Sequence, residues 1–262
     1  MNEDERRRLE RFLADEIGVT SRFIHREEAE FGEKDNWKNV RGHCLIEAAR
    51  VSIFADILGF DRELTQDVAL AALLHDGHKQ QEIEAIQEDM RRGGSGRAGS
   101  LAATHIYLER LAVEGVRERV IRLIGFAGGM PEALLAARHI LDQHALTNDD
   151  LAALLIHYTD AYTRNDLWTE PASGDLNDLD RRAEKNKNNS NYQKINDEIK
   201  GMLSNNPTFR GLTGFEAMVV LGREIEKKLS PFLSMRIGGI IEPVKIPETI
   251  DKLLRERVTL LA

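Results

Sequence analysis

The stretch Leu70–Ala71–Ala72–Leu73–Leu74–His75–Asp76–Gly77 guides the interpretation of the whole chain. An apolar run with helical character is followed at once by two side chains that can bind metal, and then by glycine, which commonly ends helices. A helix that is apolar on almost all sides is expected at the centre of a bundle. The polar pair His75–Asp76 at the end of such a helix therefore requires an explanation.

Most of the chain has the 3.6-residue apolar period of amphipathic helices, and no strong period-2 alternation indicates a strand. The sequence therefore predicts an all-α protein. Besides the helix that ends at His75–Asp76, the expected helices span residues 4–17, 20–32, 37–58, 101–113, 116–126, 131–144, 148–164, 214–229 and 247–261. We expect a mobile glycine-rich loop at residues 91–100 and a long polar loop at residues 170–191.

Polar stretches divide the predicted helices into three parts. Residues 1–35 form an N-terminal helical lead, residues 36–170 a helical core, and residues 171–262 a polar loop with a C-terminal helical extension. In the extension, Phe215, Met218 and Ile225 form an apolar stripe that needs a partner surface. Either a second copy of the chain, in a homodimer, or the chain's own core would satisfy this stripe.

Composition narrows the classes of function. Of the 262 residues, 42% are hydrophobic and 31% are charged, which is typical of a globular protein. The net charge of −8 has the wrong sign for broad nucleic-acid binding. The single cysteine, Cys44, excludes an internal disulfide. Because neither a secretory signal nor an apolar run near the roughly 20 residues of a membrane span is visible, we expect a cytoplasmic protein with no membrane partner.

Two further residues that can bind metal lie inside predicted helices, His43 before the quoted stretch and Asp160 after it. Imidazole and carboxylate ligands suit Mn²⁺, Fe²⁺, Co²⁺, Ni²⁺ or Zn²⁺, and less readily Mg²⁺. Adjacent helical residues diverge by about 100°, so His75 and Asp76 reach one ion only from the helix end, where Gly77 permits it. The combination predicts a metal site between helices.

Each of these residues also has an ordinary structural explanation. A histidine at a helix C-terminus interacts favourably with the helix dipole. Asp160 has Arg164 one turn further on and can pair with it. The metal interpretation therefore depends on the residues acting together.

The order His, His-Asp, Asp on separate helices resembles the HD superfamily of metal-dependent phosphohydrolases. The similarity covers residues 37–164. It is carried by the segments Arg41–Gly42–His43 with Glu47–Ala48–Ala49, Ala71–Ala72–Leu73–Leu74–His75–Asp76, and Leu154–Leu155–Ile156–His157–Tyr158–Thr159–Asp160–Ala161. The resemblance implies an HD-type helical bundle that binds a metal ion through His43, His75, Asp76 and Asp160. It also implies hydrolysis of a phosphomonoester or phosphodiester in a small nucleotide substrate.

The resemblance further implies catalytic roles for Asp76 and Lys79. Asp76 would orient or deprotonate a water, and Lys79 would contact a substrate phosphate. Many family members read His-Asp-x-Gly-Lys, whereas this chain reads His75–Asp76–Gly77–His78–Lys79, so the lysine keeps its place and the glycine does not. The alternative for Lys79 is a solvated lysine after a helix end.

The metal count depends on the remaining histidines. Two-metal members of the superfamily have extra histidines between the His-Asp pair and the last Asp, but here His105, His139 and His144 are not convincingly spaced. The segment Gly125–Gly129 also lacks a histidine that relatives often place there. We therefore expect one divalent ion. The alternatives are a dinuclear enzyme, either a cyclic-dinucleotide phosphodiesterase or a di-iron oxygenase-like member, and a non-catalytic regulatory domain that binds metal or nucleotide.

An acidic protein that binds phosphates must concentrate positive charge locally. Besides the metal and Lys79, the glycine-rich loop offers Arg91, Arg92 and Arg97. These arginines either close over an anionic substrate or remain solvated.

Overall fold

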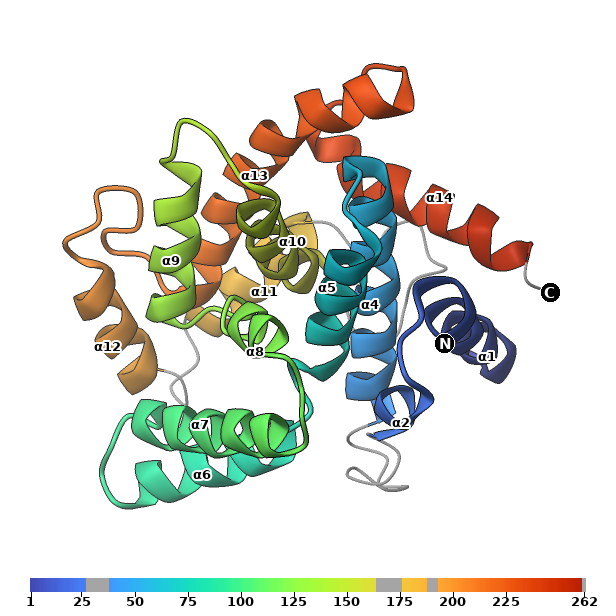
Figure 1. The fold of residues 1–262 in the computed structure, drawn as a ribbon. Coiled ribbons are helices and arrows are strands. Elements are labelled where there is room, and N and C mark those ends of the chain that lie inside the picture. Colours follow the sequence, from blue (N-terminus) through green and yellow to red (C-terminus); the bar gives the residue numbers. More distant parts are fainter. Residues whose placement is uncertain (27–37, 164–175, 188–192, 261–262) are drawn as a thin grey trace.

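The computed structural model describes residues 1–26, 38–163, 176–187 and 193–260, and in these residues every regular element is helical (Figure 1). The expected all-α class is confirmed, while an HD-type arrangement of the helices stays a prediction. The α-helices are α1 (Glu3–Arg11), α2 (Ser21–Ile24), α4 (Lys38–Leu58), α5 (Arg62–Leu74), α6 (Lys79–Arg91), α7 (Arg97–Val113), α8 (Glu118–Ile124), α9 (Pro131–Leu141), α10 (Asn148–Tyr162), α11 (Leu176–Lys187), α12 (Gln193–Leu203), α13 (Gly214–Ile237) and α14 (Ile246–Thr259). A π-helical turn, η1 (Phe12–Ile17), extends α1, and a 3₁₀ turn, η3 (Pro243–Lys245), precedes α14.

Helix ends follow the capping signals in the sequence. Asn2 and Glu5 form a capping box at the start of α1, and Gly18, with φ 83°, ends η1 in the left-handed conformation. Asp61 accepts a hydrogen bond from the Leu64 amide at the start of α5. The helix expected at residues 20–32 contains α2, and its part beyond residue 26 lies outside the described residues, as does the Asp160–Arg164 pairing.

Helices α4, α5 and α10 form the centre of the molecule (Figure 1). α4 packs against α5, α10, α13 and α14, and α5 also packs against α8. On α4, the apolar residues Cys44, Ala48, Val51 and Ala55 follow helical spacing and are fully buried. The helix that precedes His75–Asp76, α5, therefore lies at the centre of the bundle, as its apolar sequence predicts.

A single hydrophobic core includes residues from all three predicted parts of the chain, although the domain division itself stays a prediction. Met218 and Ile225 of α13 are buried in this core. The apolar stripe of the C-terminal extension packs on the chain's own core. The stripe therefore no longer supports a homodimer.

A buried ion pair joins the C-terminal helix α14 to the centre. The Arg50 guanidinium on α4 donates two hydrogen bonds of 2.7 Å to the Asp251 carboxylate, and a third, of 2.9 Å, to the Thr163 hydroxyl. The Arg50 side chain has no exposed surface. Because an unpaired buried charge is costly, this pair ties α14 to α4.

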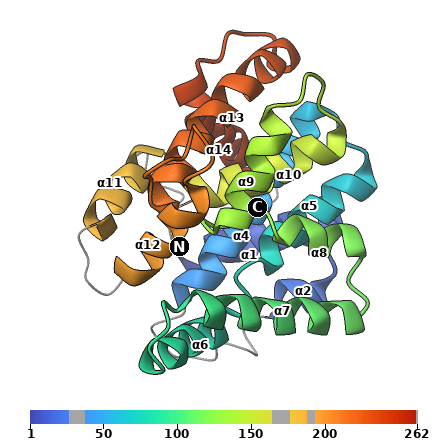
Figure 2. The same cartoon turned by 90° about the vertical axis from the view of Figure 1, so that its left-hand side faces the viewer.

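Helices α6 and α7 lie side by side as a hairpin at one end of the molecule (Figures 1 and 2). Helices α6 and α12 were not among the predicted helices, and the glycine-rich loop expected at residues 91–100 is shorter, because α7 begins at Arg97. A Cβ on Gly99 would lie 2.2 Å from the Ala85 carbonyl oxygen, so this glycine permits close contact between two helices. Arg97 forms ion pairs with Glu132 and Glu198, and this pairing opposes a role as a lid arginine.

The polar loop expected at residues 170–191 is wrong for residues 176–187, which form α11. Leu176, Leu179 and Ala183 are buried at helical spacing, and this stripe was hidden among charged and amide residues. The rest of that predicted loop lies outside the described residues. Of the helices in the described ranges, none has the length and apolar character that crossing a bilayer requires.

Candidate metal centre

Four side chains from three helices meet in the interior. α4 contributes two of them, one helical turn apart; the end of α5 contributes the third and α10 the fourth. We call these residues the donor cluster: His43, Glu47, His75 and Asp160. One potential ligand atom from each lies within 4.8 Å of the others. The structure thus brings together three of the four ligands expected from the sequence and adds Glu47.

The contacts in the donor cluster are close but leave room between the atoms. His43 Nε2 lies 3.5 Å from Glu47 Oε2 and 3.4 Å from Asp160 Oδ1. His75 Nε2 lies 3.7 Å from Asp160 Oδ1. Nitrogen and oxygen ligands bind transition metals at about 2.0–2.2 Å, so two ligand atoms of one tetrahedral ion lie about 3.4 Å apart. The donor cluster has suitable dimensions for one ion.

The end of α5 orients His75. Its Nδ1 lies 2.8 Å from the Ala72 carbonyl oxygen, which belongs to the last turn of the helix and has no intrahelical partner. Nδ1 must donate in this bond, because a carbonyl oxygen can only accept. In the neutral ring this leaves the Nε2 lone pair facing Asp160, as a ligating histidine requires. The helix stop after Leu74 therefore determines which nitrogen enters the donor cluster.

Two buried atoms of the donor cluster lack hydrogen-bond partners among the described residues, namely His75 Nε2 and Glu47 Oε2. An unsatisfied buried polar atom costs about 1–3 kcal/mol. One cation would satisfy both atoms, and two imidazoles with two carboxylates suit Mn²⁺, Fe²⁺, Co²⁺, Ni²⁺ or Zn²⁺. The residues present therefore fit a divalent metal ion.

The charges in the donor cluster also favour a cation. Burial raises the pKa of Glu47 well above its usual value, and nearby Asp160 adds to this. Burial would lower the pKa of His75, but Glu47, Asp76 and Asp160 outweigh it and raise that pKa to about 10. Without a metal the donor cluster therefore retains protons, and a divalent ion would replace them.

The Asp160 carboxylate stays ionised. Burial favours its neutral form, but hydrogen bonding and charge from His43, the charge of His75 and the Gly128 amide hold its pKa well below the usual value. The amide of Gly128 donates a 2.6 Å hydrogen bond to Asp160 Oδ2. Asp160 is therefore ready to bind a cation at neutral pH.

Exposure increases from the bottom of the site to its mouth. The Glu47 and His75 side chains are 0% and 3% exposed, Asp160 14%, Asp76 22% and Lys79 37%. Glu47 thus lies deepest, and the open side faces the start of α6. Ligands from solvent would meet Asp76 and Lys79 first.

Asp76 lies beside the donor cluster rather than within it. Its Oδ2 is 3.6 Å from His75 Nε2, and its Oδ1 is 3.3 Å from Lys79 Nζ. Burial would raise the pKa of Asp76, but Lys79, His75 and His43 hold it at about 2. Its expected role as a metal ligand stays a prediction, and its carboxylate is ionised at the mouth of the site.

Lys79 is paired with two carboxylates. Its Nζ is 3.0 Å from Glu82 Oε2 in addition to the contact with Asp76. Asp76 first, and then Glu82, outweigh burial and raise the pKa of Lys79 above its usual value, so the amine stays charged. The predicted phosphate contact requires the substrate to compete with both carboxylates for this amine.

Glu47 was missed as a site residue, although its segment carried part of the resemblance. The available signal was its position four residues after His43, on the same face of one helix. The histidines considered for a second metal do not join the donor cluster. His105 is 74% exposed and contacts Glu109, while His139 and His144 are exposed.

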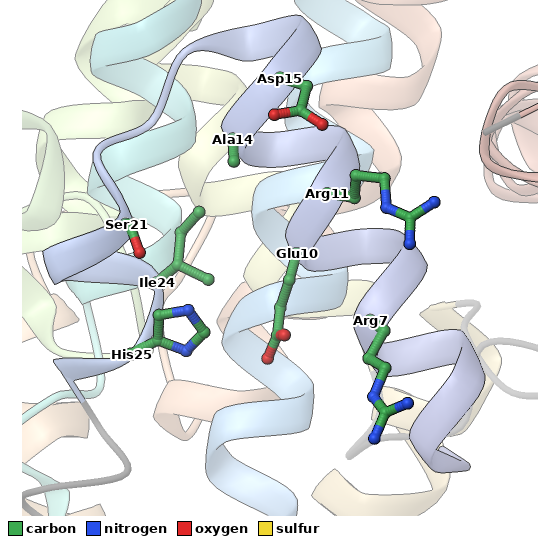
Figure 3. A pocket seen from close by; sticks show the side chains of 8 residues that line it. All are labelled: Arg7, Glu10, Arg11, Ala14, Asp15, Ser21, Ile24 and His25. Carbon is green, nitrogen blue, oxygen red and sulfur yellow. The ribbon is translucent and has the colours of Figure 1, made fainter. Parts of the chain in front are cut away.

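A surface hollow of about 320 Å³ lies apart from the donor cluster, between α1 with η1 and α2 (Figure 3). Its lining residues are Arg7, Glu10, Arg11, Ala14, Asp15, Ser21, Ile24 and His25. The lining mixes charges of both signs and shares no residue with the donor cluster. We therefore place the chemistry at the donor cluster, where the buried unsatisfied atoms lie.

Comparison of the chain with protein-family models, curated proteins and solved structures gives no match. The class that fold and site define together is an all-helical protein with a buried His/Glu/His/Asp group that could hold a metal ion.

Proposed function

We propose that the protein is a metal-dependent phosphohydrolase of the HD type that cleaves a phosphomonoester or phosphodiester in a small nucleotide substrate. The observation that carries the proposal is the buried meeting of two imidazoles and two carboxylates, with His75 Nε2 and Glu47 Oε2 unsatisfied. The chain order of His43, the His75–Asp76 pair and Asp160, which resembles the superfamily, supports it.

In this proposal the donor cluster holds one divalent ion. When bound, the ion supplies Lewis acidity to a phosphoryl oxygen and lowers the pKa of water. His75 is held for this task by Ala72, and Asp160 by Gly128. These fixed bonds keep the ligands in place before the ion arrives.

Asp76 orients the attacking water. Its carboxylate is partly exposed at the mouth of the site and can accept a hydrogen bond from a water there. A carboxylate with a pKa of about 2 is a weak base. We therefore assign Asp76 to orienting the water rather than to holding its proton.

Lys79 contacts the substrate phosphate by exchanging one of its carboxylate partners for a phosphate oxygen. Its ammonium group lies at the mouth of the site and stays charged. A phosphate oxygen that displaces Glu82 would keep the Lys79 charge balanced. This step ties substrate binding to the start of α6.

A non-catalytic domain that binds metal or nucleotide is the second candidate function. The double pairing of Lys79 favours it, because an ammonium group shared by two carboxylates is a weaker phosphate ligand. Such a domain would bind a nucleotide without consuming it.

The proposal is tested by metal analysis and hydrolysis assays on wild type, His75→Ala and the control His105→Ala, which alters an exposed histidine. Each protein is purified without an affinity tag and soaked in Mn²⁺, Co²⁺ or Zn²⁺. The assays use p-nitrophenyl phosphate, its bis-ester, nucleoside monophosphates and cyclic nucleotides. We expect a bound ion and hydrolysis in wild type and control, and neither in His75→Ala.

The other outcomes separate the alternatives. A bound ion with no turnover of any ester would refute the hydrolase and support the binding domain. No bound ion in wild type after soaking would refute the metal centre itself.

A further inference from the structure

Helix α7 lies beside α6 and turns a polar face toward the start of that helix (Figure 2). Three side chains at helical spacing make up this polar face: Ser100, Thr104 and Tyr107. Ser100 donates a 2.6 Å hydrogen bond to Glu82 Oε1, and the Thr104 hydroxyl lies 2.9 Å from His78 Nε2. The buried Tyr107 donates a 2.7 Å bond to the Leu74 carbonyl oxygen. The segment from the end of α5 to the first turn of α6 therefore rests on α7.

The Tyr107 hydroxyl fills the space beside Gly77. A Cβ at that glycine would lie 2.3 Å from Tyr107 Oη, so a larger residue there would displace the hydroxyl. The Leu74 carbonyl that accepts the Tyr107 bond also accepts a bond of 3.1 Å from the Gly77 amide. The close contact with Tyr107 gives a physical reason for glycine at this position, two residues after His75.

His78 attaches the other end of the same turn to α7. Its buried ring stacks on the Tyr107 ring, with centroids 4.6 Å apart and an angle of 12° between the planes. His75 and Asp76 lie between Leu74 and His78 in the chain. The two residues that face the site are therefore attached to α7 through the residue before them and through His78 after them.

The backbone of this turn decides whether His75 and Asp76 face the same site. The Ala72 carbonyl orients the His75 ring, but adjacent residues of a continuing helix would diverge by about 100°. The groups of a working site must be held within about 0.5 Å of their positions by the residues around them. The contacts from α7 provide such support at the point where α5 ends.

We propose that Tyr107 is a positioning residue of the metal centre, whose hydroxyl and ring hold the turn at residues 74–78 so that His75 and Asp76 face one site. This inference rests on the metal centre of the proposed function. It adds α7, a helix that contributes no residue to the donor cluster, as a support of that centre.

The first test compares Tyr107→Phe, which keeps the ring and removes the hydroxyl, with the control Tyr158→Phe. Tyr158 is also fully buried, and its hydroxyl bonds Glu226 at 3.0 Å. Co²⁺ binding is measured by calorimetric titration. We expect Tyr107→Phe to weaken it by roughly 10-fold, the lower end of the range for groups that support a ligand, and Tyr158→Phe to bind as wild type does.

The outcomes of this titration separate the inference from the metal centre. Equal Co²⁺ affinities in Tyr107→Phe and Tyr158→Phe would overturn the inference and leave the metal centre standing. No binding by wild type would overturn both.

The second test follows the turn in the metal-free protein by amide hydrogen exchange. The Gly77 and Lys79 amides donate hydrogen bonds of 3.1 and 2.9 Å within the turn. Tyr107→Phe should speed the exchange of both by about 5-fold, as for the loss of one hydrogen bond, and leave the Gly59 amide, in the turn between α4 and α5, unchanged. No change at Gly77 and Lys79, or an equal change at Gly59 that indicates a general loss of stability, would overturn the inference.

The third test examines the contact between Gly77 and Tyr107. Gly77→Ala should weaken Co²⁺ binding, because the added Cβ meets the Tyr107 hydroxyl. In the double variant Gly77→Ala/Tyr107→Phe the hydroxyl is absent and the nearest ring carbon is 3.0 Å away, so the loss should be smaller than the product of the two single losses. A loss equal to that product would show that the two residues act independently and would overturn the inference.

Discussion

Replacing Glu47 by Gln should weaken metal binding and leave the stability of the metal-free protein nearly unchanged. The side chain is fully buried, and burial keeps its pKa well above the usual value. Glutamine has nearly the same shape as the protonated carboxyl, which is the form that burial favours, so the metal-free variant should melt close to wild type. It lacks the anionic oxygen that faces His43 and His75, so its metal binding should be weak.

The magnitude follows from ligand linkage. Metal at 100 times the dissociation constant stabilises a protein by about 2.7 kcal/mol. For 262 residues the unfolding entropy is about 0.55 kcal/mol per kelvin, so the melting temperature should rise by about 5 °C. If Glu47→Gln weakens binding by about 100-fold, at the upper end of the range for supporting groups, the same metal concentration gives about 0.4 kcal/mol and under about 1 °C.

The assay is thermal unfolding, followed by circular dichroism, with and without Co²⁺ at 100 times the wild-type dissociation constant. Glu226→Gln is the control, because Glu226 is also buried but bonds Tyr158 and Arg223 outside the donor cluster. Without metal this control should melt at a lower temperature than wild type, and Co²⁺ should still raise its melting temperature by about 5 °C. The reasoning is refuted if Co²⁺ also raises the melting temperature of Glu47→Gln by this amount.

Three further predictions test the charges and contacts described above. In the metal-free protein, burial lowers the pKa of His75 but the surrounding carboxylates raise it from 6.5 to about 10, so the native state holds a proton that the unfolded chain releases. The resulting stability is complete below pH 6.5 and is lost as the pH rises toward 10. Urea unfolding should show the free energy of unfolding falling over this range, with a smaller fall in His75→Gln. A wild-type free energy of unfolding that does not change with pH would contradict this prediction. Asp251→Ala leaves the buried Arg50 charge unpaired and should lower the unfolding free energy by about 3–5 kcal/mol. The double variant Arg50→Leu/Asp251→Leu should lose clearly less in denaturant titrations, and an equal loss would count against a buried unpaired charge as the cause. Gly99→Ala should destabilise the hairpin of α6 and α7, because the added Cβ would lie 2.2 Å from the Ala85 carbonyl oxygen. Gly201→Ala, in α12 where an added Cβ meets nothing within 4 Å, should instead stabilise the protein by about 0.5–1 kcal/mol. Equal melting temperatures of the Gly99→Ala and Gly201→Ala variants would contradict the close contact between α6 and α7.

The helical class and most helix positions could be predicted from the sequence, because apolar period and capping are local properties. The end of α5 after Leu74 and the position of α4 were both predictable in this way. Helix α6 was missed because none of its residues is fully buried, and α11 because its buried residues Leu176, Leu179 and Ala183 lie among polar neighbours. In both helices the apolar pattern was too weak for a local reading.

Which chemical groups meet depends on how the helices pack in three dimensions. His43, His75 and Asp160 were candidates from the sequence, but their distances depend on how α4, α5 and α10 pack. The presence of Glu47 beneath them, and the bond from the Gly128 amide to Asp160, depend on the same packing. A periodic pattern indicates which face of a helix is buried. A metal centre depends on how that face is placed relative to the buried faces of the neighbouring helices, and only the packing of the helices sets this placement.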